Sequence, residues 1–178
     1  MFAKLSHEYF ELIKNQKNFR KQHTNSIKLN MVILGHKLGY RVYTNGLTQD
    51  QISKIGNGFV NKEWLYDIHW YKDKKGEYYM PEILSLAAES ELGHWKKGDS
   101  SKMKNPAVKF DFQKLLITNA ELRLLVFKTR SKLELEELNL YFEKAIKAYP
   151  HLTKKSLFLF VCFEHETKNL FYCEKHKT

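Results

Sequence analysis

Three acidic residues stand at positions in the sequence where carboxylates are able to support metal-dependent chemistry. Asp67 lies in a stretch rich in aromatic and β-branched residues, and Glu89 and Glu91 end an apolar run. Side chains alternate between the two faces of a strand, so Glu89 and Glu91 share a face if this run is extended. Converging carboxylates repel each other unless a cation lies among them, and oxygen ligands suit Mg²⁺ or Mn²⁺. The spacing is compatible with a metal site, and the alternative is a strand end that emerges into solvent.

Hydrophobic periodicity predicts the elements that would position these acids. We expect strands over residues 40–43, 63–71, 83–92, 122–128, 157–163 and 170–173. We expect helices over residues 5–20, 27–38 and 108–120, with a polar break at 23–26, and a last helix that Ser131 and Glu134 open as a capping box. On the strand over 63–71, Leu65, Asp67, His69 and Tyr71 would share one face. Strands separated by helices favour an α/β fold, with a central mixed β-sheet flanked by helices.

The size and composition of the chain suit one folded domain. Its 178 residues are 43% hydrophobic and 14% aromatic, which is sufficient for a packed core. We therefore expect a single domain over 1–178, with a helical N-terminal part over 1–40 and a core over 40–178. No apolar run approaches the roughly 20 residues of a membrane helix, and the first residues do not resemble a signal peptide, so we expect a cytoplasmic protein.

The charge of the chain points to a polyanionic partner. The formal net charge is +10, and lysine supplies most of the excess. A basic surface attracts nucleic acid through its phosphates, although a lysine-rich composition is also compatible with a general compositional bias. Cys162 and Cys173 are too few for a disulfide framework or a zinc site, and we expect both to be buried as small apolar side chains.

The acidic motifs resemble those of the PD-(D/E)XK nuclease superfamily. Trp64-Leu65-Tyr66-Asp67 looks like its acidic strand, and Ala88-Glu89-Ser90-Glu91 looks like its (D/E)-X-K strand. The segments 111–116 and 122–127 look like the helix and the strand that follow. The resemblance covers about residues 60–128 by motif and most of the chain by element order. Within the superfamily, this stretch is similar to a group of bacterial and phage-associated proteins. It implies a restriction endonuclease-like fold.

The resemblance implies a Mg²⁺-dependent endonuclease that hydrolyses phosphodiester bonds of DNA. Asp67, Glu89 and the main-chain carbonyl of Ser90 would hold the metal, with Mn²⁺ as a substitute. Glu91 stands where most members have a lysine, as it does in some restriction endonucleases. Either Glu91 or Lys114 on the following helix would then orient or deprotonate the attacking water. The alternative for Lys114 is an exposed helix lysine.

Further residues are candidates for contact with the substrate. Four lysines follow Glu91 in a polar loop and would hold the DNA backbone, unless the loop is simply solvated: Lys96, Lys97, Lys102 and Lys104. Glu63 would add an acid, and His69 shares the face of Asp67, but both are more typical of structural positions. A homodimer is also compatible with the resemblance. The alternative function is a catalytically inactive nucleic-acid-binding or interaction protein with the same fold.

Overall fold

The computed structural model describes residues 3–4, 19–53, 55, 60–61, 65–93 and 105–177. The helices are α2 (Phe19–Lys37), α3 (Gln49–Ser53), α4 (Pro106–Ile117) and α5 (Lys132–Ala148). The strands are β1 (Ala3–Lys4), β2 (Arg41–Thr44), β3 (Val60–Asn61), β4 (Ile68–Asp73), β5 (Pro81–Glu91), β6 (Leu122–Thr129), β7 (Leu157–Glu164) and β8 (Asn169–His176). No helix within these ranges is long and apolar enough to cross a membrane.

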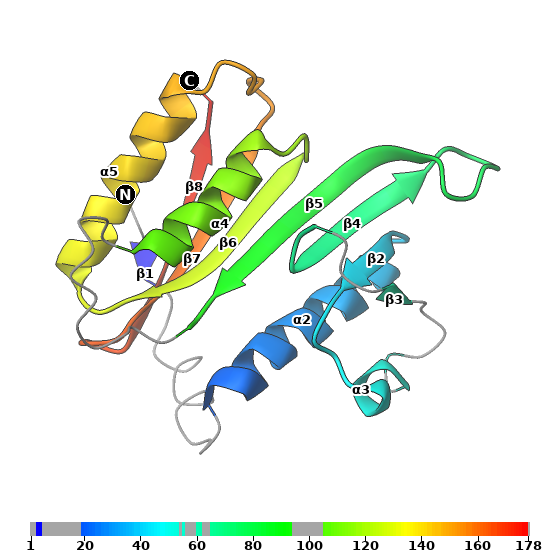
Figure 1. Cartoon of the computed structure of the whole chain (residues 1–178), viewed down its shortest axis with the longest axis horizontal. Coiled ribbons are helices and arrows are strands. Elements are labelled where there is room, and N and C mark those ends of the chain that lie inside the picture. The colour runs from blue at the N-terminus through cyan, green and yellow to red at the C-terminus, as the bar shows by residue number, and fades with distance from the viewer. Residues whose placement is uncertain are drawn as a thin grey trace.

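One mixed sheet organises the chain, in the order β1-β8-β7-β6-β5-β4-β2-β3. Strands β5, β6 and β7 are parallel, whereas β4 is antiparallel to both β5 and β2. Parallel neighbours need a crossover, and α4 and α5 supply the two crossovers on one side of the sheet (Figure 1). The prediction of an α/β fold with a mixed sheet flanked by helices is confirmed.

The face of the sheet under α4 and α5 carries an aromatic core. Phe112, Phe142, Phe158 and Phe160 have no exposed surface, and the rings of Phe142 and Phe160 stack 4.5 Å apart. Burial of each such ring stabilises the fold by roughly 1.5–3 kcal/mol. This core fixes α4, which carries Asp111 and Lys114, against the central strands.

A buried arginine also fixes the end of α4. Arg123 on β6 is 3% exposed, and its guanidinium donates from Nε to the carbonyl oxygen of Leu115 at 3.1 Å and from Nη2 to that of Thr118 at 2.5 Å. The carbonyl oxygen of Leu115 also accepts from the cap N–H of Thr118 at 3.3 Å, and the guanidinium adds a donor at this helix end and joins α4 to β6.

The opposite face packs against α2 through a second cluster of apolar side chains. Val32 of α2 is fully buried there together with Val42, and Trp70 and Leu86 pack beside them. Gly35 allows the close approach, because a Cβ atom at this position would lie 2.8 Å from both Trp70 Nε1 and Val42 Cγ2. The glycine therefore sets how near α2, and the lysine it carries, comes to the sheet.

Several predicted elements agree with the structure. The segments 40–43, 83–92, 122–128, 157–163 and 170–173 form strands within a few residues of the expected bounds. Ser131 caps α5 by accepting a hydrogen bond from the backbone N–H of Glu134, at 3.4 Å. The carboxylate of Glu134 accepts from the N–H of Arg130 instead of the cap residue itself. Both cysteines are buried and free, as expected.

Two predictions at the N-terminal side are wrong. The polar break at 23–26 does not occur, since α2 continues through these residues; weak local preferences give way to the tertiary packing of the apolar stripe that includes Val32. The strand over 63–71 begins only at Ile68, and residues 65–67 form a bend, so Asp67 precedes the strand. Most of the predicted helix over 5–20 lies outside the described residues.

Candidate functional site

Asp67 lies in the bend just before β4, next to the end of β5. The register pairs Ile68 with Ala88, so Asp67 comes level with Glu89. Its Oδ2 accepts a hydrogen bond from the backbone N–H of Ser90 at 2.9 Å. Its own carbonyl oxygen accepts from Thr44 Oγ1 at 3.0 Å. These bonds on both sides fix the acid between β5 and the end of β2.

Glu89 is a buried carboxylate on the α4 side of the sheet. It is 3% exposed, and its Oε1 forms an ion pair with Nζ of Lys114 at 2.5 Å. Burial, with a smaller effect from the charges of Asp111 and Asp67, raises the pKa of Glu89 to about 7 although Lys114 opposes the shift. A carboxyl group with this pKa is poised to exchange its proton for a cation near neutral pH.

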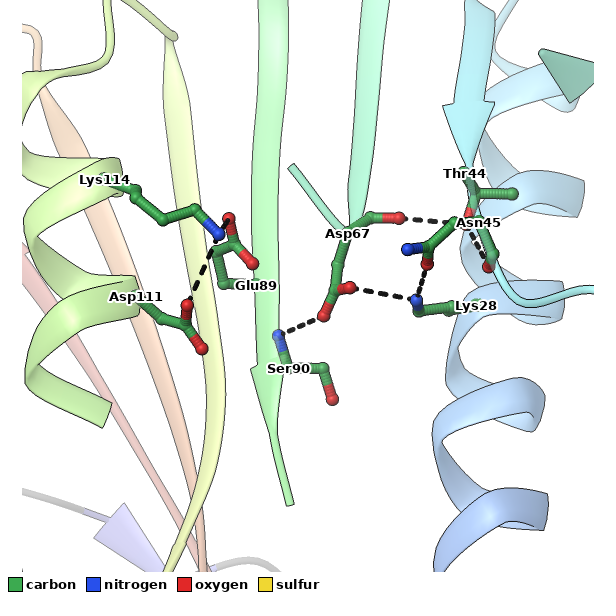
Figure 2. A network of polar contacts seen from close by, with 8 residues as sticks. All are labelled: Lys28, Thr44, Asn45, Asp67, Glu89, Ser90, Asp111 and Lys114. Carbon is green, nitrogen blue, oxygen red and sulfur yellow. Dashed lines mark hydrogen bonds and ion pairs between the residues drawn. The ribbon is translucent and has the colours of Figure 1, made fainter. Parts of the chain in front are cut away.

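Asp111 is a third carboxylate beside this pair. It lies three residues before Lys114 on α4, so both point from the same helix face, and Lys114 Nζ is 3.4 Å from Asp111 Oδ1. Burial raises the pKa of Asp111, and the charge of Asp67 adds to the increase although Lys114 lowers it. Glu89 and Asp111 therefore share the Lys114 ammonium on one side of β5, and Asp67 lies on the other side of that strand (Figure 2).

A second lysine approaches Asp67 from α2. Lys28 is 4% exposed, and its Nζ lies 3.0 Å from Asp67 Oδ1. The same ammonium donates to Oδ1 of Asn45, in the turn that follows β2. Figure 2 shows Asp67 between Ser90 on one side and this Lys28–Asn45 pair on the other. The site is therefore a layered network of acids and lysines, with helices α2 and α4 contributing from opposite faces.

Of the predicted site residues, Glu89 and Lys114 form an ion pair, and Asp67 binds the backbone of Ser90, the residue after Glu89. The helix lysine is 26% exposed and ion-paired, which differs from the freely exposed alternative. Ser90 contributes its N–H to Asp67. Glu91 ends the strand, and its Oε1 accepts from the N–H of Gly93 at 2.7 Å, so this carboxylate orients the chain as it leaves β5.

Of the remaining predicted residues, only His69 lies within the part of the chain that the structure describes. His69 is 3% exposed and stacks on Tyr43 with ring centroids 4.5 Å apart. Burial lowers the pKa of His69 to about 4, so its imidazole is neutral at physiological pH and serves as a packing group. The others lie outside the described residues: Glu63, Lys96, Lys97, Lys102 and Lys104.

Sequence reasoning missed three members of the network: Lys28, Asn45 and Asp111. Asp111 stands three residues before Lys114, which already indicates a shared helix face. Lys28 stands four residues before Val32, on the buried stripe of its helix, where a lysine needs a partner. The partner itself, Asp67, is 39 positions away along the chain and follows only from the fold.

Carboxylate oxygens are ligands that suit a hard divalent cation. Within the described ranges, no group of three or more His, Cys, Asp or Glu side chains is arranged to hold a metal ion. Mg²⁺ is usually bound through one or two carboxylates while it keeps several waters. Asp67 and Glu89 each offer carboxylate oxygens of the kind that this looser mode uses, and each is paired with a lysine that a cation would have to displace.

Comparisons of the chain with protein-family models, with curated proteins and with solved structures found no match in any of the three.

Proposed function

We propose that this chain is a Mg²⁺-dependent nuclease that hydrolyses phosphodiester bonds of DNA. The observation that carries the proposal is the buried Glu89–Lys114 ion pair at the end of β5, with Asp67 bonded to the backbone N–H of the next residue, Ser90. The order of acidic strand, second acidic strand, helix and parallel strand is the order that the PD-(D/E)XK resemblance requires. That agreement supports a restriction endonuclease-like fold.

Asp67 and Glu89, with the main-chain carbonyl of Ser90, would hold the divalent ion. The chemistry that Mg²⁺ supplies when bound is the activation of water and the neutralisation of charge on the phosphate. Asp67 is held for this role by the Ser90 N–H at Oδ2, and its Oδ1, which Lys28 contacts at 3.0 Å, is the oxygen that would meet the cation. Glu89 is buried, so a nearby cation favours its ionised form.

Lys114 acts as a donor in this proposal. Burial alone lowers the pKa of its ammonium, but Glu89 and Asp111 together outweigh that effect and raise it. The side chain is therefore charged at neutral pH, and it can hold the attacking water or a phosphate oxygen by hydrogen bonding. It takes the place of the lysine that most members of the superfamily carry at the position of Glu91.

The DNA substrate is supported by charge alone. The net charge of +10 favours a polyanion through phosphate contacts and counterion release. Along the sequence, four lysines come after the end of β5, namely Lys96, Lys97, Lys102 and Lys104.

A non-catalytic nucleic-acid-binding protein is the second candidate function. The observation in its favour is that both acids already have resident lysine partners, Lys28 for Asp67 and Lys114 for Glu89. A pseudo-enzyme of this kind would keep the charge network as a structural element and would bind DNA without cutting it.

Cleavage of supercoiled plasmid DNA separates the two candidates. We expect the wild type to nick the plasmid in Mg²⁺ or Mn²⁺ and to be inactive in EDTA. We expect Asp67→Asn to cut at least about 100-fold more slowly, because the loss of one positioning or electrostatic group typically lowers the rate of an enzyme by this factor. Lys132→Met is the matched control, since Lys132 pairs with Glu136 on the exposed face of α5. Equal cutting by wild type and Asp67→Asn would remove the enzyme proposal for this site, and salt-dependent binding without cutting would favour the second candidate.

A further inference from the structure

Lys28 is an unusual lysine because its charged end is enclosed. Its side chain is 6% exposed, whereas lysines are almost never buried unless they are paired. The ammonium has two oxygen acceptors, the charged Oδ1 of Asp67 and the neutral amide oxygen of Asn45. Asp67 is also the acid that the proposed nuclease site depends on, so the lysine occupies an oxygen that a metal would need.

The surrounding fold holds this lysine in place. Lys28 lies seven residues before Gly35, so both are on the face of α2 that contacts the sheet. The approach of α2 is fixed at Gly35 by Trp70 and Val42. Asn45 follows β2, the strand that pairs with β4, and Thr44 beside it is bonded to the Asp67 carbonyl. The lysine, the amide and the acid are thus joined through packed elements.

We propose that Lys28 is a built-in counter-ion of Asp67 that a divalent cation must displace, and that Asn45 retains the ammonium once Asp67 is released. This inference rests on the proposed metal site and adds a residue that sets its affinity. An ammonium and a divalent ion compete for the same carboxylate oxygen, since both neutralise its charge. A neutral amide acceptor keeps the ammonium hydrogen-bonded in the loaded state, so that it is not left buried without a partner.

The other lysine of the network is less suited to this role. Lys114 is shared between Glu89 and Asp111, and its side chain is 26% exposed, so it keeps a carboxylate partner or water when one acid turns to a metal. For Lys28, Asp67 is the sole carboxylate paired with the ammonium in the part of the chain that the structure describes. The two lysines therefore have different roles in this proposal. Lys28 competes with the metal for Asp67, and Lys114 stays in place to bind water or phosphate.

The test is the affinity of the metal-free protein for Mn²⁺ alone, measured by isothermal titration calorimetry without nucleic acid. Lys28→Met keeps the aliphatic stem and removes the charge, and we expect it to bind Mn²⁺ at least about tenfold more tightly, equal to about 1.4 kcal/mol. Asn45→Ala removes the second acceptor, and we expect it to bind about fivefold more weakly, equal to about 1 kcal/mol, because the displaced ammonium loses a hydrogen bond. Lys132→Met, which removes the same charge far from the site, should stay within about twofold of the wild type.

The outcomes separate this inference from the proposed function. If the wild type binds Mn²⁺ and Lys28→Met binds it no more tightly, the proposal that the metal displaces Lys28 is wrong, but the proposed metal site is retained. If no variant binds Mn²⁺, both are overturned. If circular dichroism shows that Lys28→Met is unfolded, Asn45→Ala is the deciding variant. Weaker Mn²⁺ binding by Asn45→Ala supports the displacement of Lys28, and unchanged Mn²⁺ binding overturns it.

Discussion

Removal of the Lys114 charge should destabilise the protein in a manner that depends on pH. Lys114→Met keeps most of the stem but leaves the Glu89 carboxylate, 3% exposed, without the ammonium that lies 2.5 Å from it. Loss of one partner of a buried pair typically costs about 3–5 kcal/mol. Because Lys114 is about a quarter exposed, water replaces part of the interaction, and we expect about 2 kcal/mol at pH 8.

The sign of the pH effect follows from Glu89. Its pKa is raised to about 7 in the folded protein, so between the ordinary value of 4.5 and 7 the folded state holds a proton that the unfolded state releases. The contribution of Glu89 to stability is therefore fully present below pH 4.5 and is lost as pH rises through 7. At pH 5 the carboxyl is neutral, and Lys114→Met should cost less than about 1 kcal/mol.

Urea unfolding followed by tryptophan fluorescence, in EDTA at pH 5 and pH 8, measures this difference. Glu89→Gln supplies the control, because in that background the charge is already absent and Lys114→Met should cost less than about 1 kcal/mol at both pH values. An equal loss of stability at pH 5 and pH 8, with no recovery in the double variant, would refute the account of the Glu89–Lys114 pair.

Two further predictions concern the packing that supports the site. Gly35→Ala should lower the free energy of unfolding by about 1–3 kcal/mol, because the new methyl group would lie 2.8 Å from Trp70 and Val42, and a urea titration without such a loss would contradict the close approach of α2. Burial raises the pKa of the Cys162 thiol to about 12, so iodoacetamide at pH 8 should leave Cys162 unmodified in the folded protein and alkylate it in urea. Mass spectrometry of the peptides measures the modification, and rapid labelling of the folded protein would contradict a buried thiol.

The sequence predicts the strands of the site better than the way they meet. The alternation of residues 83–92 places Glu89 and Glu91 on one face, and this follows directly from strand geometry. Asp67, by contrast, was expected within a strand but lies in a bend before it, and the β4–β5 register contains two irregularities, between Trp70 and Tyr71 and between Lys72 and Asp73. Irregularities of this kind change which residues face each other and leave no mark in a periodic pattern.

The lysines illustrate a second limit on sequence reasoning. Lys114 could be selected because its helix follows the acidic strand along the chain. Lys28 could not, because its contact with Asp67 spans 39 positions and depends on the packing of α2 against the opposite face. Local patterns identify elements and faces, whereas the partner of a buried charge depends on the assembled fold.

A crystal of this protein soaked in MnCl₂ would test the central claim most directly, through the anomalous scattering of the metal. The account predicts a peak at the strand ends with oxygen ligands from Asp67 and Glu89, and with Lys28 withdrawn to Asn45. No peak at this position in a well-soaked crystal, with Lys28 still on Asp67 and Lys114 still on Glu89, would contradict it.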